Sequence, residues 1–279
     1  PAAAAAAAFQ LGELAFGEAE VREAYGRLNQ AARLRPDNAE YRNLAGRAAQ
    51  EAGDLDAARS HLEAALELRR KAVPADAAAL TQSLINLALL HKQARRHAEA
   101  EALYLEAMDL QQAQAPPDAA LVGLIKNNLA QLYRSAAPDT PAMRERIQAL
   151  LDESLEAARR AHGADSVETA TAMNNLAAFH AANGQAGSAQ PLYQAALALR
   201  EKLLPADHPD IAASLNNLAA LHADDGRPQE AEALYRRALA IQQRTLGAEH
   251  RAVAVTLNNL GQTLHRLRRS ADAESSYRQ

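Results

Sequence analysis

Cysteine and tryptophan are absent from the 279-residue chain, and aromatic residues make up only 4 % of it. Without cysteine the chain forms no disulfide and no thiolate metal site. No apolar run approaches the roughly 18–20 residues of a membrane-spanning helix, so membrane insertion is not expected. The composition does not choose a compartment; we favour the cytoplasm and leave export open.

Strong basic charge and catalytic motifs are missing as well. The net charge of −4 argues against a nucleic-acid partner, which usually requires a strongly basic face. The sequence has no glycine-rich phosphate loop, no Gly-x-Ser-x-Gly and no Cys/His nucleophile pair. Carboxylates are plentiful but scattered. We therefore expect no enzyme activity, no cofactor and no metal site.

What the chain does contain is alanine and repetition. Alanine is the commonest residue and has the best intrinsic helix propensity. The stretch Leu215–Ala219, Leu-Asn-Asn-Leu-Ala, has near-copies along the chain. The residue aligned with Ala219, here called the anchor, is small in every copy. The anchors are Gly12, Gly46, Ala88, Ala130, Ala177, Ala219 and Gly261.

The residues that follow each anchor keep a fixed spacing. Small residues lie 12 and 19 positions after Gly46, at Ala58 and Ala65, with Leu62 between them at 16. The first two anchors are 34 residues apart, and the later ones are 42 apart except for one gap of 47. A small–large–small pattern at this period, on two helices joined by a turn, resembles the tetratricopeptide repeat (TPR).

The 42-residue form resembles the kinesin light chain class of TPR more closely. The resemblance rests on Leu192-Tyr193, Arg200–Leu203, His208-Pro209-Asp210 and Leu215–Ala219, and it covers residues 76–279 better than 5–70. The Ala/Arg-rich composition looks like that of a bacterial member. The resemblance implies an all-α, right-handed TPR superhelix of antiparallel helix pairs, forming a single array over 1–279. The expected repeats are 5–38, 39–76, 77–118, 119–165, 166–207, 208–249 and a truncated 250–279.

Turn residues set the expected helix ends. Acidic caps are predicted at Asp76, Asp118 and Asp165, the last with capping-box spacing to Glu168, and in the stretch Asp207-His208-Pro209-Asp210. The fourth repeat is five residues longer, and its extra length falls at 135–141, where two prolines predict a loop. This loop is either a tolerated surface insertion or a protrusion that contacts a partner.

The resemblance also implies a binding face. In TPR arrays the first helix of each pair lines a concave groove, and a recurrent asparagine there holds the backbone of an extended peptide. An Asn side chain both donates and accepts, so it pairs with any peptide backbone. We expect the second Asn of each pair to face the groove: Asn86, Asn128, Asn175, Asn217 and Asn259. For the first Asn, a role in ordering the helix stack is equally open: Asn127, Asn174, Asn216 and Asn258.

Neighbouring groove positions change in character along the chain. The early repeats place Arg47, Lys92, Gln131 and Arg134 there, the later ones Ala178, Ala220 and Gln262, with Ala181 and Ala223 beside them. This predicts a basic part and a roomy part, and hence a peptide with acidic residues at one end and bulky apolar ones at the other. The alternative is that these charges only solvate helix faces, since Glu51 and Asp224 lie nearby.

Histidine recurs three residues after the anchor, at His91, His180 and His222, with Tyr133 in the fourth repeat. Exchange with tyrosine indicates packing, and histidines a full repeat apart do not form a metal site.

The leading function is a non-catalytic scaffold that binds a peptide or protein segment. Two alternatives stay open: a regulatory or targeting region of a larger protein, because the chain stops at Gln279 inside an expected helix, and self-association through the exposed last repeat.

Overall fold

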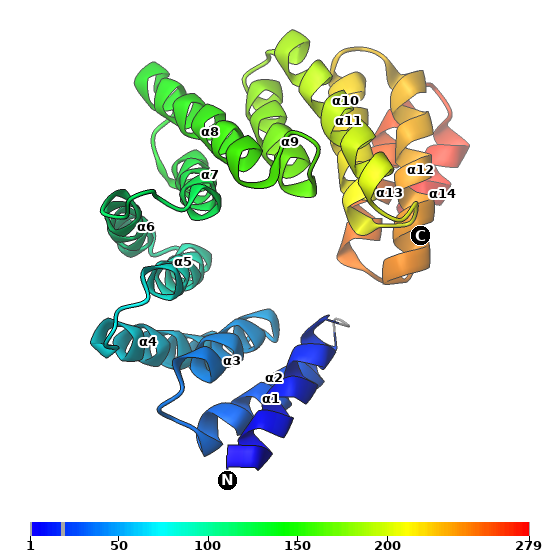
Figure 1. Cartoon of the computed structure of the whole chain (residues 1–279). Helices are drawn as coiled ribbons and strands as arrows, with labels where there is room; N and C mark the ends of the chain where they lie inside the picture. Colours follow the sequence, from blue (N-terminus) through cyan, green and yellow to red (C-terminus); the bar gives the residue numbers. More distant parts are fainter. Residues whose placement is uncertain (1, 18–19, 279) are drawn as a thin grey trace. The chain divides into compact units, whose positions relative to one another are not determined.

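The computed structural model describes residues 2–17 and 20–278, and this part of the chain consists of helices and turns without a strand (Figure 1). The predicted all-α fold is confirmed. Pro1 and Gln279, at the expected array ends, lie outside the described residues. The helices are α1 (Ala2–Gly17), α2 (Val21–Leu34), α3 (Ala39–Glu51), α4 (Leu55–Lys71), α5 (Ala77–Gln93), α6 (His97–Gln112), α7 (Ala119–Ala136), α8 (Pro141–His162), α9 (Val167–Ala182), α10 (Ala186–Leu203), α11 (Pro209–Asp224), α12 (Pro228–Leu246), α13 (Arg251–Arg266) and α14 (Ser270–Arg278).

The chain divides into two compact units, Pro1–Ile147 and Gln148–Gln279, here called unit 1 and unit 2. Within each unit, helices that are neighbours in sequence pack against one another, most extensively as α1 with α2, α3 with α4 and α5 with α6, and as α9 with α10 and α11 with α12. The short α14 packs on α13 less extensively. The single continuous array stays a prediction.

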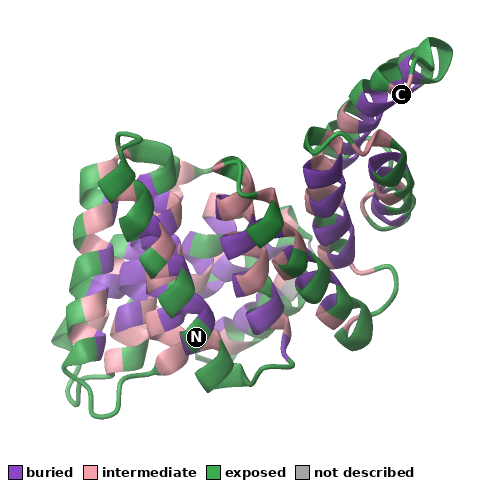
Figure 2. Cartoon of the chain, turned by 90° about the horizontal axis from the view of Figure 1, so that it is seen from above, coloured by how far each residue is buried: buried purple, intermediate pink, exposed green. Residues whose placement is uncertain are grey.

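The small residues of the repeat pattern make the contact inside each pair. Ala58, Ala65, Ala88, Ala177 and Ala219 have no exposed surface. Figure 2 shows buried surface along the sides of helices that meet their neighbours. Because alanine has only a methyl group, two helix backbones can approach closely along this stripe. The stripe therefore explains why alanine dominates the composition.

Three anchors need glycine because the partner side chain lies even closer: a Cβ on Gly12 would meet Leu28 Cγ at 2.6 Å, and the other two are Gly46 and Gly261. A Cβ on Gly46 would meet Leu62 Cγ at 2.7 Å, and a Cβ on Gly261 would meet Tyr277 Cε1 at 2.4 Å. All three distances are shorter than a normal carbon–carbon contact.

Two of the four predicted acidic caps occur, and two are wrong: Ser166 caps α9, and His208 caps α11 by accepting from Asp210 N at 3.1 Å. Asp76 accepts from Ala79 N at 2.9 Å, and Asp118 accepts from Ala120 N at 2.9 Å. At α9, however, the N-cap is Ser166, whose hydroxyl accepts from Thr169 N at 3.1 Å. Asp165 instead accepts a hydrogen bond from Lys202 Nζ at 2.5 Å. The side chain of Ser166 is shorter than that of Asp165, and its hydroxyl reaches the third amide of the helix directly.

The loop predicted at 135–141 is shorter in the structure. Helix α7 continues through Ala136, since Ala137 N still bonds to Tyr133 O at 2.9 Å, and Pro141 already begins α8. Proline suits the first helical position because its missing N–H needs no partner there. Thr140 caps the helix, accepting from Met143 N at 3.2 Å. The loop is thus a tight connection rather than a seven-residue protrusion.

Candidate functional site

The asparagines on the first helix of each pair form a bond that the sequence did not reveal. Asn86 Nδ2 on α5 donates to Asn43 Oδ1 on α3 at 2.9 Å. In unit 2, Asn217 Nδ2 on α11 donates to Asn174 Oδ1 on α9 at 3.1 Å. In both units the second Asn of one repeat therefore binds the first Asn of the preceding repeat. We call this the asparagine ladder; it joins successive first helices.

The ladder corrects the expected exposure of the second asparagines. Asn86 is only 5 % exposed and also accepts from Gln82 Nε2 at 3.0 Å, so its amide is fully engaged. Asn128 is only 6 % exposed, and its Nδ2 has no partner among the described residues. The ladder position preceding Asn128 is Ile85, which offers no oxygen. These two residues are buried because the ladder lies between packed helices.

The remaining asparagines are more accessible. Asn258 is exposed, and Asn216 Nδ2 donates to Thr256 Oγ1 at 2.8 Å. The others are half-buried: Asn127, Asn174, Asn175, Asn217 and Asn259. Both members of an asparagine pair therefore contribute to stacking, and partial exposure is not reserved for the second.

The predicted basic positions gather on α3, α5 and α7 of unit 1. Lys92 is half-buried, and its Nζ donates to Gln131 Oε1 at 3.2 Å. Burial lowers the pKa of Lys92, and the nearby Arg134 guanidinium lowers it further. Arg134 and Arg47 are exposed, and the Arg47 guanidinium lies 5.3 Å from the centre of the Phe16 ring. Lys92, Gln131 and Arg134 thus form one polar cluster.

A cavity of about 460 Å³ opens beside this cluster. Its lining includes Lys92, Arg95 and His97, with Leu89, Gln93 and Ser135. His97 Nδ1 is buried and has no hydrogen-bond partner among the described residues. Two cationic side chains and an imidazole nitrogen suit a carboxylate ligand.

Arg95 has a strained backbone, with φ = 58°. It lies seven residues after its anchor, where the other turns use Gly53, Gly184 and Gly226, all with positive φ. A left-handed conformation costs an L-residue roughly 1–2 kcal/mol relative to glycine. Arg268 is the other described non-glycine residue with positive φ and occupies the same position in the last repeat. The chain therefore keeps an arginine at the cavity at some cost in stability.

The predicted roomy positions belong to unit 2. Ala178 and Ala220 are half-buried, as are Ala181 and Ala223, and Gln262 is exposed. Because these side chains end at Cβ, they add little bulk to α9 and α11, and the roomy face stays a prediction. This face carries little charge compared with that of unit 1.

Packing explains the recurrent His/Tyr position. His91 and His222 are buried. Tyr133 is buried as well, and its hydroxyl donates to Glu101 Oε1 at 2.7 Å beneath the Arg146 guanidinium. His180 Nδ1 lies 2.6 Å from Gln185 Oε1. The position therefore packs a ring between helices, and in His91 and His222 the ring nitrogen Nδ1 is buried as well.

Sequence reasoning missed two arginines that connect successive repeats, the half-buried Arg69 and the buried Arg200. Arg69 donates to Ala79 O and to Ser83 Oγ, both at 2.7 Å. Arg200 donates to Asp210 O at 3.0 Å and to Ser214 Oγ at 2.8 Å, and also to Thr171 Oγ1 at 2.9 Å. The signal was present in the sequence, because both arginines lie 23 residues after their anchors.

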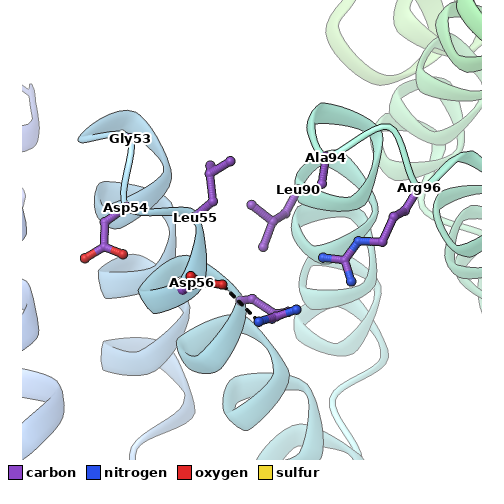
Figure 3. Close-up of a pocket in the computed structure, with 8 residues that line it drawn as sticks. Gly53, Asp54, Leu55, Asp56, Leu90, Ala94 and Arg96 are labelled. Atoms are coloured by element: carbon purple, nitrogen blue, oxygen red, sulfur yellow. Dashed lines mark hydrogen bonds and ion pairs between the residues drawn. The ribbon is translucent and has the colours of Figure 1, made fainter.

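A further cavity of about 470 Å³ lies at the turns of α3–α4 and α5–α6 (Figure 3). Asp56 and Arg59 in its wall bind each other at 2.9 Å, whereas Asp54 caps α4. None of the predicted site residues lines it. Searches of the described residues show no helix long and apolar enough to cross a membrane, and no group of three or more side chains suited to a metal ion.

Comparison with known families gives consistent matches. Models described as Tetratricopeptide repeat match residues 145–202, 168–243 and 210–279, and also 39–76 and 80–113. Together these ranges cover well over half of the chain. None of the curated proteins compared with the chain matches it in sequence.

Solved structures with similar folds include kinesin-light-chain-like proteins. BtubC (BKLC) from P. vanneervenii is 25 % identical with a TM-score of 0.64, over 88 % of this chain and 91 % of that chain. A kinesin light chain protein from Podosopora anserina, with nearly identical TPR-like repeats, is 22 % identical with a TM-score of 0.58, over 71 % and 91 %. The quorum sensor NprR from B. thuringiensis, in its apo form, is 13 % identical with a TM-score of 0.75, over 97 % and 73 %. The last two show the fold alone. The chain therefore belongs to the tetratricopeptide repeat family and is similar to its kinesin-light-chain-like members.

Proposed function

We propose that this TPR protein is a non-catalytic scaffold that binds an extended segment of a partner protein on the first helices of its pairs. TPR repeats generally mediate protein–protein interaction, which supports the general role. The specific proposal is that the basic cluster of unit 1 receives acidic residues of the ligand. The small-residue face of unit 2 suits bulky apolar residues.

The observation that carries the proposal is Arg95. Three other repeats have glycine at this turn, and of the two arginines that replace it, Arg95 and Arg268, it is Arg95 that lines the cavity beside Lys92. Arginine at this strained position places a guanidinium beside Lys92, on the wall of a cavity large enough for a side-chain carboxylate. Strain retained at the edge of a cavity is typical of a binding site.

The asparagines take a different part in binding from the one that the sequence implied. Asn86 and Asn217 are committed to the ladder and set the spacing of the first helices. Asn128 has an amide nitrogen without a partner among the described residues. A ligand carbonyl that reached it would satisfy a buried donor, which is worth about 1–3 kcal/mol.

The test uses Arg95→Gly with Arg268→Gly as its matched control. Both changes relieve a left-handed arginine, so both should raise the free energy of unfolding by about 1 kcal/mol. Only Arg95→Gly should weaken the binding of a fluorescent peptide rich in Glu and Leu, by about three- to ten-fold. The salt dependence of binding should also decrease. Equal affinity of the two variants for this peptide would contradict the proposal.

Self-association through α13 and α14 is a second candidate. Val255 on α13 is 50 % exposed and Tyr277 on α14 is 51 % exposed. Apolar surface of this kind is often covered in assemblies. Light scattering over a range of protein concentrations should then show a concentration-dependent mass, which Val255→Ser reduces; a strict monomer would exclude it.

A further inference from the structure

A groove between α4, α5 and α6 of unit 1 is separate from the basic cluster. It encloses about 530 Å³. Leu66, Leu87 and Leu103 contribute its apolar surface. Its volume lies within the range of about 300–1,000 Å³ that is common for ligand pockets. We call it the α4–α6 groove.

Carboxylates line the rim of this groove. Glu63 and Glu99 are exposed, and neither has an ion pair or hydrogen bond with another side chain in the described part of the chain. Glu67 lies 3.5 Å from Arg70 Nη1 and 3.7 Å from Lys71 Nζ. The Arg70 guanidinium is itself held by Glu106, at 2.7 and 2.9 Å. The groove thus keeps uncompensated negative charge beside an apolar surface.

His91 supplies a second, independent sign of an unfilled site. Its side chain lines the groove, the residue is only 9 % exposed, and its Nδ1 has no partner among the described residues. Burial lowers the pKa of His91, and Arg96 adds to this effect, whereas Glu99 and Glu63 oppose it. The imidazole is therefore neutral at pH 7, and one of its nitrogens can accept a hydrogen bond from a ligand.

Unit 2 contains the equivalent positions without the free carboxylates. The same offsets from the anchors give Leu197, Leu218 and Leu234 for the leucines and His222 for His91. Gln194 and Ala198 replace Glu63 and Glu67. The counterpart of Glu99 is Glu230, which lies 3.6 Å from Arg227 Nη1 and 4.0 Å from His222 Nε2.

This internal comparison shows that the repeat stacks without acidic residues at these positions. Packing therefore does not account for Glu63 and Glu67. Glu63 has no partner in the described part of the chain, and Glu67 has only the long contacts with Arg70 and Lys71. Exposed carboxylates of this kind, adjacent to leucines, complement a cationic and partly apolar partner.

We propose that the α4–α6 groove binds a protein segment that presents a lysine or arginine beside aliphatic residues. The cation lies between Glu63 and Glu99, within reach of the His91 ring, and the aliphatic side chains cover the three leucines. This partner has the opposite charge to the ligand expected at Lys92 and Arg95. The two surfaces can therefore be tested separately.

The experiment measures fluorescence anisotropy of a labelled amphipathic peptide of Leu and Lys with the full chain. Glu63→Gln/Glu67→Ala gives the groove the side chains of unit 2. Glu145→Gln, an exposed carboxylate on α8, is the matched control. The double variant should bind about five- to ten-fold more weakly, and the control should bind like the wild type. Leu103→Arg should reduce binding at least as much, because it places a cation inside the groove.

The opposite results are equally definite. The proposal is overturned if the wild type shows no measurable binding of the Leu/Lys peptide, or if the double variant binds it as tightly as the wild type. It is also overturned if a peptide with Glu in place of Lys binds equally well. Circular dichroism of each variant checks folding, and Arg95→Gly should leave the affinity for the Leu/Lys peptide unchanged.

Discussion

Unit 1 and unit 2 share the contacts that stack one repeat on the next. Each has one asparagine ladder bond, Asn86 to Asn43 and Asn217 to Asn174. Each also has an arginine, half-buried Arg69 or buried Arg200, that bonds to a carbonyl and a serine hydroxyl of the following first helix. These contacts use residues at the same offset from the anchor, so they belong to the repeat itself.

The two units differ at positions that the stack leaves accessible. Unit 1 presents Lys92 and Arg134 on its first helices, where unit 2 presents alanines. On the other surface, Glu63 and Glu67 of unit 1 correspond to Gln194 and Ala198 of unit 2. Since stacking tolerates both sets, the differences are the part of the sequence that is free to specify ligands.

Removal of this arginine should have the largest effect and should be unequal between the units. Arg200→Met removes three hydrogen bonds and leaves the buried Ser214 hydroxyl without its donor, at a cost of about 2–4 kcal/mol in the free energy of unfolding. Arg69→Met removes two bonds and should cost less, about 1–2 kcal/mol. Urea unfolding of the two variants measures the loss in the free energy of unfolding. Hydrogen exchange shows in which unit the loss occurs.

The control for this prediction is Arg237→Met. Arg237 is exposed and pairs with Glu201 at 2.7 Å, so its loss should change stability by less than about 0.5 kcal/mol. If Arg69→Met lowered the free energy of unfolding as much as Arg200→Met, the third bond of Arg200, to Thr171, would contribute nothing. The two arginines would then stabilise their units equally.

The next effect concerns the anchor. Gly46→Ala would place a Cβ 2.7 Å from Leu62 Cγ, so Leu62 must move, at a cost of about 1–3 kcal/mol. Gly26→Ala is the matched control, because nothing lies within 4 Å of its Cβ and alanine favours the helix by about 0.5–1 kcal/mol. Thermal unfolding should therefore shift in opposite directions. If Gly46→Ala instead raised the melting temperature, α3 and α4 would be able to accommodate the added Cβ without loss of stability.

The sequence was sufficient for the features that repeat. The spacing of Ala88, Ala177 and Ala219 predicted the helix pairs and the small-residue contact, because helical periodicity alone puts these residues on one stripe. The expected role of Lys92 and Gln131 in a ligand groove stays a prediction; the hydrogen bond between them was not foreseen.

Features that depend on how one helix is rotated against the next were not predictable from periodicity. Whether Asn86 faces solvent or Asn43 depends on how α3 and α5 are each rotated about their own axes. The predicted end of α7 was also wrong. Ser135 and Ala136 extend the helix by two residues, although the nearby prolines predicted a loop there. Proline restricts the residue before it, and that residue here is Ala137, after the helix ends.

A smaller effect should separate a bonded asparagine from an unbonded one. Asn86→Ala removes the ladder bond and leaves Asn43 without its donor, at a cost of about 1 kcal/mol. Asn128→Ala removes an amide nitrogen that has no partner among the described residues, so it should cost clearly less. Chemical unfolding of both variants tests this. Equal losses would mean that Asn128 is bonded in solution.

The smallest effect is a pH dependence that should be stronger in unit 1. Burial, as the main cause, lowers the pKa of His61 and His91 in unit 1 and of His222 in unit 2 from the ordinary value of 6.5. The folded state therefore binds these protons less readily than the unfolded state. Stability should be constant above about pH 7 and should fall as the pH drops below 6.5.

Hydrogen exchange at pH 7.5 and pH 5.5, corrected for the intrinsic exchange rate, should then show a larger loss of protection in unit 1, which has two such histidines, than in unit 2, which has one. His91→Tyr isolates the contribution of the His91 ring. The equivalent position in the next repeat is Tyr133, which packs in the same place. Burial raises the pKa of Tyr133 to about 12, so a tyrosine here does not titrate between pH 5.5 and 7.5. In this variant the loss of protection at low pH should be similar in unit 1 and unit 2. If unit 1 still lost more protection than unit 2, the pH dependence would come from carboxylates or from His61, and His91 would not contribute to it.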